Sequence, residues 1–186
     1  MQFFKKLEIH GFKSFGNKTT IDFHPGTTVI VGPNGCGKSN VFVSIRWVLG
    51  EQSAKSLRGS RMGDVIFSGS GTMKALGMAS VKLTLNNRNR TLPLDFDEVE
   101  ISRRLFRTGE SEYMLNKQQC RLKDIINQFL DTGIGTDSYS VMEQGKVVLD
   151  GTAEQLANLV VYTASPHART ISGQSLSVCG DTNMLT

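Results

Sequence analysis

A chain of 186 residues with 39% hydrophobic and 20% charged residues has the composition of a globular domain with a real core, which excludes the disordered and fibrous classes. No apolar stretch approaches the roughly 20 residues that cross a bilayer, and the first residues lack the apolar core of a signal peptide, so we expect a cytoplasmic protein without a membrane segment. The formal net charge is +4. Such an excess is compatible with phosphate-rich partners, but many basic proteins have merely a solvated charged face, so charge is supporting evidence only.

The first fifty residues predict three strands followed by a loop and a helix. Residues 7–10 and 20–23 alternate between apolar and polar side chains, which predicts two half-buried strands joined around residues 11–18. The β-branched run 27–31 predicts a buried strand, and residues 39–49 carry apolar side chains at helical spacing. This order is typical of the entry to an α/β nucleotide-binding fold.

The loop between the third strand and the helix has a specific pattern. Residues 32–39 read G-P-N-G-C-G-K-S and fill every fixed position of the phosphate-binding loop G-x-x-x-x-G-K-[S/T]. Glycines let backbone N–H groups turn around phosphate oxygens, and the helix start adds unpaired N–H groups. Lys38 would add a charge at the β and γ phosphates, and the Ser39 hydroxyl would be one ligand of a magnesium ion. Nucleotide binding is the leading hypothesis, and a glycine-rich turn that binds nothing is the alternative.

The segment after the helix has a different composition. Residues 50–71 are rich in Ser, Gly and basic side chains and contain one apolar island at residues 65–67. We expect a long surface segment, and a segment just beyond a phosphate loop helix can reach the bound nucleotide.

The middle of the chain predicts two hairpins and a short helix. Residues 81–86 and 99–106 have the alternation of paired strands, and a turn lies between them. Residues 113–115 and 119–121 flank a tighter turn, after which residues 122–129 carry apolar side chains on one helical face. We expect these pieces to form a β-rich subdomain.

Three groups of chemically interesting side chains have no clear motif. Three arginines in the predicted hairpin form either a basic surface for phosphate backbones or a soluble exposed face: Arg103, Arg104 and Arg107. The histidines share no spacing with carboxylates or cysteines, so we interpret them as structural, and we interpret the cysteines as reduced thiols without a metal. They are His10, His24 and His167, and Cys36, Cys120 and Cys179.

Several further short segments, each present once, follow one another along the chain. They are residues 11–15 (GFKSF), Asn40 after the loop, and residues 46–55 (RWVLGEQSAK), 57–59 (LRG), 64–67 (DVIF), 113–116 (YMLN), 121–125 (RLKDI) and 143–147 (EQGKV). Together with the loop, they resemble the N-terminal head of bacterial chromosome-segregation SMC ATPases.

The resemblance implies a fold and a site. The fold is an α/β, P-loop, ABC-type ATPase head, of which residues 1–150 form the N-terminal lobe only, with a mixed sheet and the β-rich subdomain. The cofactors are ATP and Mg²⁺, with Lys38, Arg58 and Gln144 as catalytic residues, Arg58 as the arginine finger, and Ser39 and Gln144 as magnesium ligands. The residues implied at the nucleotide are Lys13, Ser14, Gly32, Pro33, Asn34, Gly35, Cys36, Gly37, Lys38, Ser39 and Asn40.

One local departure from the family pattern lies in the helix after the loop. This chain has Val43-Ser44 where the family usually has Asp-Ala. A missing Asp removes a structural hydrogen bond, so we expect an effect on stability before any effect on binding.

A larger departure concerns what the sequence lacks. It contains neither the family's signature segment nor its acidic Walker B strand, and no coiled-coil heptads. We therefore expect a truncated half-head of an ATPase for chromosome condensation and segregation that does not hydrolyse ATP alone. Its implied partners are a C-terminal head lobe, a second SMC copy, and DNA through the assembled complex, in the cytoplasm and associated with the nucleoid. The alternatives are a non-catalytic nucleotide- or DNA-binding fragment and an ABC-type ATPase related to DNA repair.

The last part of the chain, residues 151–186, changes character. It is similar to the C-terminal end of short-chain dehydrogenases, where a helix and the last strand lie, and Thr152 with Gln155 fits a capping box. That family's dinucleotide loop and catalytic set are not present, so no oxidoreductase activity is expected. The tail is either a fragment of another gene joined to a truncated frame, or a helix and strand that pack on the head.

Overall fold

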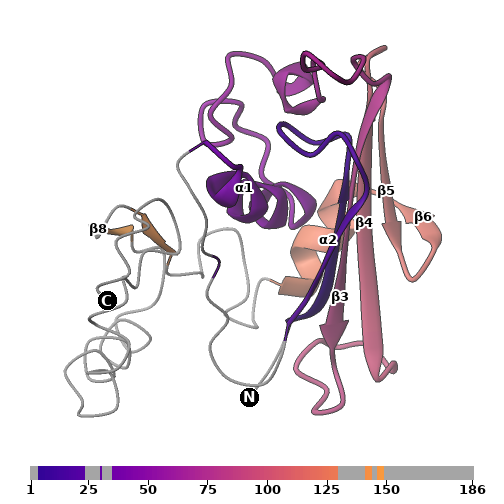
Figure 1. Ribbon diagram of the computed structural model, residues 1–186. Helices are drawn as coiled ribbons and strands as arrows, with labels where there is room; N and C mark the ends of the chain where they lie inside the picture. Colours follow the sequence, from indigo (N-terminus) through magenta and orange to yellow (C-terminus); the bar gives the residue numbers. More distant parts are fainter. Residues whose placement is uncertain (1–3, 24–29, 31–34, 130–140, 144–145, 149–186) are drawn as a thin grey trace, which may run out of the picture.

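The computed structural model describes residues 4–23, 30, 35–129, 141–143 and 146–148 (Figure 1). In chain order the elements are β1 (Phe4–His10), β2 (Thr19–Asp22), α1 (Lys38–Val48), the 3₁₀ helix η1 (Met62–Val65), β3 (Met78–Asn86), β4 (Glu98–Phe106), β5 (Ser111–Leu115), β6 (Gln118–Cys120), α2 (Leu122–Phe129), β7 (Val141–Glu143) and β8 (Lys146–Val148).

The main sheet joins the start of the chain to its middle. Its strand order is β2-β1-β3-β4-β5-β6, and every described pair is antiparallel. The two predicted hairpins therefore form, and they continue the sheet that β1 and β2 begin. The predicted α/β class is confirmed. The strand expected at residues 27–31 lies outside the described residues, except for Ile30.

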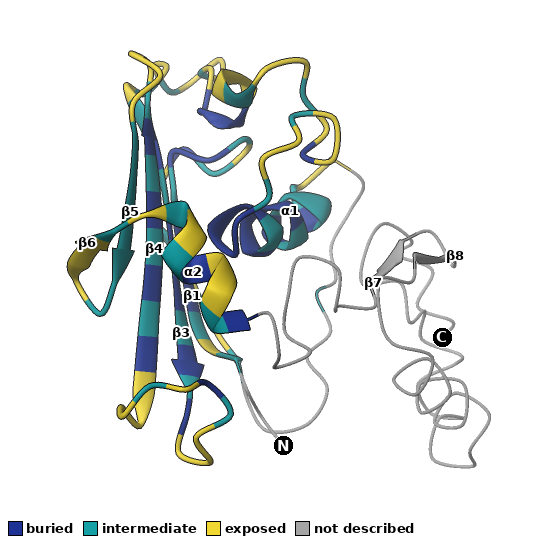
Figure 2. Cartoon of the chain, turned by 180° about the vertical axis from the view of Figure 1, so that it is seen from behind, coloured by how far each residue is buried: buried dark blue, intermediate teal, exposed yellow. Residues whose placement is uncertain are grey.

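Each face of the sheet has its own environment. Burial alternates along β3 and β4, because successive side chains of a strand point to opposite faces (Figure 2). One face is covered by α1 and α2, and it holds the buried apolar residues of the strands (Figure 1). We call this the inner face. The opposite, outer face carries the half-buried polar residues.

Helix α1 is the central element of the core. It begins within one residue of the predicted start, and its buried residues are Lys38, Val41, Val43, Ser44, Ile45, Trp47 and Val48. The Val43 side chain, which stands where the resemblance expects an Asp, is 3% exposed and belongs to the hydrophobic core. The Ser44 hydroxyl donates to the carbonyl oxygen of Val41 at 2.6 Å.

The segment after α1 is more deeply anchored than the sequence predicted. Leu57, Val65 and Ile66 are at most 4% exposed and belong to the core cluster. The N–H of Phe67 donates to the carbonyl oxygen of Gly11 at 2.8 Å. The prediction of a surface segment is therefore wrong for the apolar island, which packs under the turn after β1.

The tight turn between β5 and β6 lies where the sequence predicted it. Asn116 and Lys117 have positive φ angles of 48° and 67°, as both central residues of a type I′ hairpin turn require. The following helix α2 covers the predicted range and buries Ile125 and Phe129.

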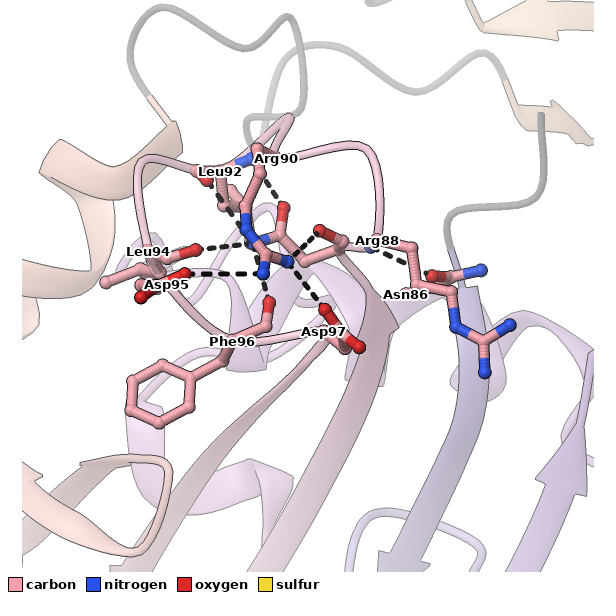
Figure 3. Close-up of polar contacts among 9 residues, drawn as sticks. Asn86, Arg88, Arg90, Leu92, Leu94, Asp95, Phe96 and Asp97 are labelled. Carbon is pink, nitrogen blue, oxygen red and sulfur yellow. Dashed lines mark hydrogen bonds and ion pairs between the residues drawn. The ribbon is translucent and has the colours of Figure 1, made fainter.

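The longer turn between β3 and β4 is organised by one buried side chain. The Asn87 side-chain nitrogen donates to the carbonyl oxygens of Leu92, Leu94 and Phe96, and its side-chain oxygen accepts the Leu92 N–H at 2.8 Å. Arg90 closes the turn by donating to Asp97 at 2.8 Å, and the Phe96 ring points away from these contacts (Figure 3). The amide thus acts as a small polar core for this hairpin tip.

Arg103 contradicts both interpretations that the sequence allowed. It is 2% exposed on the inner face, and its NH1 donates to the carbonyl oxygens of Trp47 and Glu51, each at 2.8 Å. The guanidinium also stacks on the rings of Trp47 and Tyr113, 4.6 and 4.9 Å from their centroids. Arg103 therefore closes the C-terminal end of α1, where helix carbonyls lack helical partners, and offers no surface to phosphate.

The other two arginines of this group have separate roles. Arg104 lies on the outer face and pairs with Glu112 at 3.5 Å. Arg107 donates to the carbonyl oxygens of Leu76 and Phe67 and so holds the chain before β3. The three side chains do not form one basic surface.

Candidate functional site

Two glycines with positive φ angles lie just before α1. Gly35 and Gly37 have φ angles of 83° and 92°, in the left-handed region that favours glycine. Lys38 is the first helical residue and is 8% exposed, while Ser39 is half-buried. The N–H groups at a helix start, an ammonium and a hydroxyl are the kinds of group that bind phosphate and its magnesium ion.

The turn after β1 lies against this helix start. Phe12 and Phe15 form an isolated bridge, so Lys13 and Ser14 stand at the tip of the turn. The Asn40 side-chain nitrogen donates to the Ser14 hydroxyl at 2.9 Å. A Cβ atom at Gly37 would collide with the same hydroxyl, so a side chain there would displace Ser14, and the positive φ of Gly37 also favours glycine. The predicted residues Ser14, Gly37 and Asn40 are thus brought together.

The Arg58 segment reaches the other side of the same turn. Lys13 donates through its N–H to the carbonyl oxygen of Val65 at 2.7 Å and through Nζ to that of Arg58 at 3.3 Å. Arg58 itself has a φ of 57°, a left-handed conformation that is uncommon for a residue with a side chain. Lys13 therefore joins the Arg58 segment to the start of α1.

The charges at this junction shift each other's protonation. Burial lowers the pKa of Lys13, and the positive charge of Arg58 lowers it further, while Asp64 opposes both. The backbone N–H groups of Arg61 and Ser60 lower the pKa of Asp64. The lowered pKa of Asp64 favours its charged form at this junction.

Of the site residues predicted from the sequence, the structure groups Lys13, Ser14, Gly35, Gly37, Lys38, Ser39, Asn40 and Arg58 around the start of α1 and the turn after β1. Cys36 is exposed beside them. Gly32, Pro33, Asn34 and Gln144 lie outside the described residues. Asp64 is the residue to which sequence reasoning assigned no role, because the arginine three residues before it is not among the residues that signal a helix start.

A hollow of about 410 Å³ lies on the outer face, away from this site. Its central charges pair with one another: Lys82 contacts Glu8 at 2.9 Å and Glu100 at 3.4 Å, and Lys18 contacts Glu8 at 2.8 Å. Hydrogen bonds from Lys18 and then Lys82 lower the pKa of Glu8 against the effect of burial. These paired charges form a solvated sheet face.

Known proteins resemble this chain over most of its length. Residues 3–177 match the family model of the RecF/RecN/SMC N terminal domain. A Chromosome partition protein Smc from Lactiplantibacillus plantarum is 61% identical over 143 residues, which make up 77% of this chain and 12% of that protein. This chain therefore spans only a small part of the curated relative.

Solved structures agree with the fold. The crystal structure of the SmcHead bound to the C-winged helix domain of ScpA is 42% identical with a TM-score of 0.72, and the match covers 77% of this chain and 45% of that one. A structure from work on ATP-driven dimerization and DNA-stimulated activation of SMC ATPases is 38% identical with a TM-score of 0.73 and covers 91% of this chain and 96% of that one. Among the helices that the structure describes, none is long and apolar enough to cross a membrane.

Proposed function

The chain belongs to the RecF/RecN/SMC N-terminal domain family, and we propose that it binds ATP and Mg²⁺ as the N-terminal half of an SMC-type ATPase head that serves chromosome condensation and segregation. The observation that carries the proposal is the contact between the phosphate-loop helix and the turn after β1, where Asn40 donates to Ser14 at 2.9 Å. It builds a two-sided site from segments 26 residues apart.

The residues present fit the proposed ligands. A glycine at position 37 leaves the space beside Ser14 open. At Gly35 the backbone turns with a positive φ, and the space where a Cβ atom would lie is open, with nothing within 4 Å. In this site the backbone of residues 32–40 would hold the phosphates, with Lys38 as a point charge on them. Ser39 and Gln144 would hold the magnesium ion, which neutralises charge on the phosphates when bound.

The remaining proposed roles follow from the family. Arg58 is proposed to stabilise negative charge that develops on the phosphates, and Lys13 and Ser14 to contact the nucleotide. Cys36 would contribute through its backbone, because its side chain is exposed. The roles proposed for Gln144 and for residues 32–34 rest on the sequence resemblance alone.

Hydrolysis is proposed to need a C-terminal SMC head lobe, because the sequence of this chain contains neither a signature segment nor an acidic Walker B strand. We propose that the completed head dimerises and meets DNA only as part of the assembled complex, associated with the nucleoid. One solved structure supports this proposal. It comes from work on the ATP-driven dimerization and DNA-stimulated activation of SMC ATPases.

We also propose a division of the chain into residues 1–150 and a tail of residues 151–186 similar to the end of a short-chain dehydrogenase. The alignment with the Lactiplantibacillus plantarum protein covers only 143 residues, which is compatible with this division, whereas the family model extends to residue 177 and crosses the proposed boundary. Limited proteolysis checks this division: a stable fragment ending near residue 150 supports it, and a tail that resists cleavage argues for packing on the head.

The proposed function is tested by calorimetry of Mg-ATP binding to the purified chain beside Lys38→Ala. We expect Lys38→Ala to weaken binding at least tenfold, about 1.4 kcal/mol, because the ammonium that pairs with the phosphates is lost. Lys74→Ala is the matched control, since this exposed lysine lies in the segment after η1, and it should bind as the wild type does.

A complementation assay separates an ATPase lobe from a passive binding fragment. A C-terminal head lobe supplied separately should restore hydrolysis that Lys38→Ala abolishes. A correctly folded chain whose affinity for Mg-ATP is the same with and without Lys38 would refute the proposed function.

A further inference from the structure

Asp64 links the Arg58 segment to the phosphate site without belonging to either. We infer that Asp64 is a positioning residue: its carboxylate fixes the loop of residues 58–61 and thereby holds the backbone of Arg58 on Lys13 beside the start of α1. This inference rests on the proposed function, because it assigns a task to the loop that carries the proposed arginine finger.

The shape of this loop depends on the Asp64 carboxylate. One of its oxygens, Oδ2, accepts the N–H groups of Ser60 at 2.8 Å and Arg61 at 2.9 Å. A Cβ atom placed on Gly59 would come within 3.1 Å of the Asp64 Cβ, so the loop wraps closely around this side chain. Two consecutive N–H groups on one charged oxygen define the direction in which the chain leaves Arg58.

The Arg58 segment is in turn connected to the phosphate site. Arg58 has a left-handed backbone, which persists only where the surroundings hold it. On one side Leu57 is fully buried, and on the other the Arg58 carbonyl oxygen accepts from Lys13 Nζ at 3.3 Å. The next residue after Lys13 is Ser14, which accepts from the first turn of α1. Asp64 therefore stands at one end of a continuous chain of contacts that ends at the phosphate loop.

A simpler interpretation is that Asp64 only caps the 3₁₀ helix η1. A cap explains the bond from the Arg61 N–H, but it does not require the second bond from Ser60, which lies outside the helix on the Arg58 side. The nearby charge of Lys13, which lowers the pKa of Asp64, is also not needed for a cap. The two interpretations differ in whether nucleotide binding depends on Asp64.

The chain offers a matched control for this difference. At the start of α2, Asp124 Oδ2 accepts the N–H of Arg121 at 2.9 Å, and the Asp124 N–H donates back to the Arg121 carbonyl oxygen at 2.9 Å. Asp64 makes the same pair of contacts with Arg61. Asp124 lacks the second contact into the Arg58 loop, so Asp124→Ala removes a cap of the same type away from the site.

The experiment compares Mg-ATP and Mg-ADP binding to the full chain by calorimetry. We expect Asp64→Ala to weaken Mg-ATP binding about fivefold to tenfold and Mg-ADP binding less than about twofold, since an arginine finger acts on the terminal phosphate. Asp64→Asn keeps an oxygen acceptor and should restore most of the affinity. In an Arg58→Ala background, Asp64→Ala should cause no further loss, because its effect passes through Arg58.

The outcomes are distinguishable. If the wild type binds Mg-ATP and Asp64→Ala lowers the affinity for ATP and ADP equally, or no more than Asp124→Ala does, the carboxylate is a simple cap and the inference is wrong. If Asp64→Ala and Arg58→Ala are additive, the route through Arg58 is wrong. If the folded wild type shows no Lys38-dependent binding, the proposed function fails first, and the inference fails with it.

Discussion

Arg103 and Arg104 are neighbours in β4, and they differ in almost every respect. Arg103 lies on the inner face at 2% exposure, bonded to two carbonyl oxygens at the end of α1. The Arg104 side chain lies on the outer face at 43% exposure and meets one carboxylate at 3.5 Å. The pleat of the strand alone separates them.

An arginine side chain therefore contributes differently to the stability of the fold on the two faces of the sheet. On the inner face a guanidinium replaces water as a partner of buried carbonyl groups, so its removal takes from each of them a hydrogen bond that water cannot readily replace. Burial lowers the pKa of Arg103, and Tyr113 and Glu51 oppose that effect. On the outer face water replaces any lost partner, so each ion pair contributes little.

The largest effect that the comparison predicts is for Arg103→Met. Methionine keeps much of the apolar volume but leaves two carbonyl oxygens and two aromatic rings without the guanidinium. We expect the free energy of unfolding to fall by about 3 kcal/mol, measured by urea denaturation followed by circular dichroism. Arg104→Met is the matched control and should change it by less than about 0.5 kcal/mol. Equal losses for the two variants would contradict the comparison.

A second substitution places a charge on the inner side of α1. Val43→Asp restores the residue that the family resemblance expects, but at a position that is 3% exposed in the hydrophobic core. We expect the free energy of unfolding to fall by about 2 kcal/mol, because a buried carboxylate needs a partner. Val43→Ala, which creates only a small cavity, should cost about 1 kcal/mol in the same denaturation assay. A variant with Asp that is as stable as the wild type would mean that the carboxylate finds the hydrogen bond that the sequence suggested.

The smallest effect concerns the outer face and depends on pH. Glu8 has a lowered pKa in the folded chain, so its charged form stabilises the fold above the pKa of the unfolded chain, and this contribution disappears as pH falls through the folded value. We expect Glu8→Gln to cost about 0.5 kcal/mol at pH 7 and clearly less at about pH 3, because pairs at a solvated sheet face contribute little. Urea denaturation at both pH values measures this. If Glu8→Gln lowered the free energy of unfolding equally at both pH values, the loss would come from side-chain packing and not from the charge of Glu8.

Local patterns in the sequence predicted most of the fold. Strand patterns identified β3 and β4, two short strand patterns on either side of residues 116–117 identified the β5–β6 turn, and helical spacing identified α1 and α2. Each of these signals depends on residues close together in the chain. The phosphate loop has a contiguous pattern of the same kind, and it stays a prediction because residues 31–34 lie outside the described part of the chain.

Contacts between distant residues were not predictable in this way. Arg103 meets Trp47 and Glu51, which lie 56 and 52 residues earlier, so nothing near it in the sequence marks it as buried. The role of Asp64 depends on how the chain from residue 59 to residue 61 folds back around it. The contact between the turn after β1 and the first turn of α1 was expected only from the family resemblance. Nothing in the sequence of either segment indicates that the two lie side by side.

The amide of Asn87 makes the β3–β4 hairpin tip sensitive to a chemical change of a single atom. Its nitrogen donates to three carbonyl oxygens, and only an N–H donor fits there. Deamidation would replace that nitrogen with an oxygen of a carboxylate, which cannot donate and would repel all three carbonyls. Leu92, fully buried beneath the tip, would then lose the donor to its carbonyl oxygen, while its N–H would keep an oxygen acceptor at position 87. A sample in which Asn87 had deamidated during storage would therefore have a less ordered β3–β4 hairpin tip than a fresh sample of the same sequence.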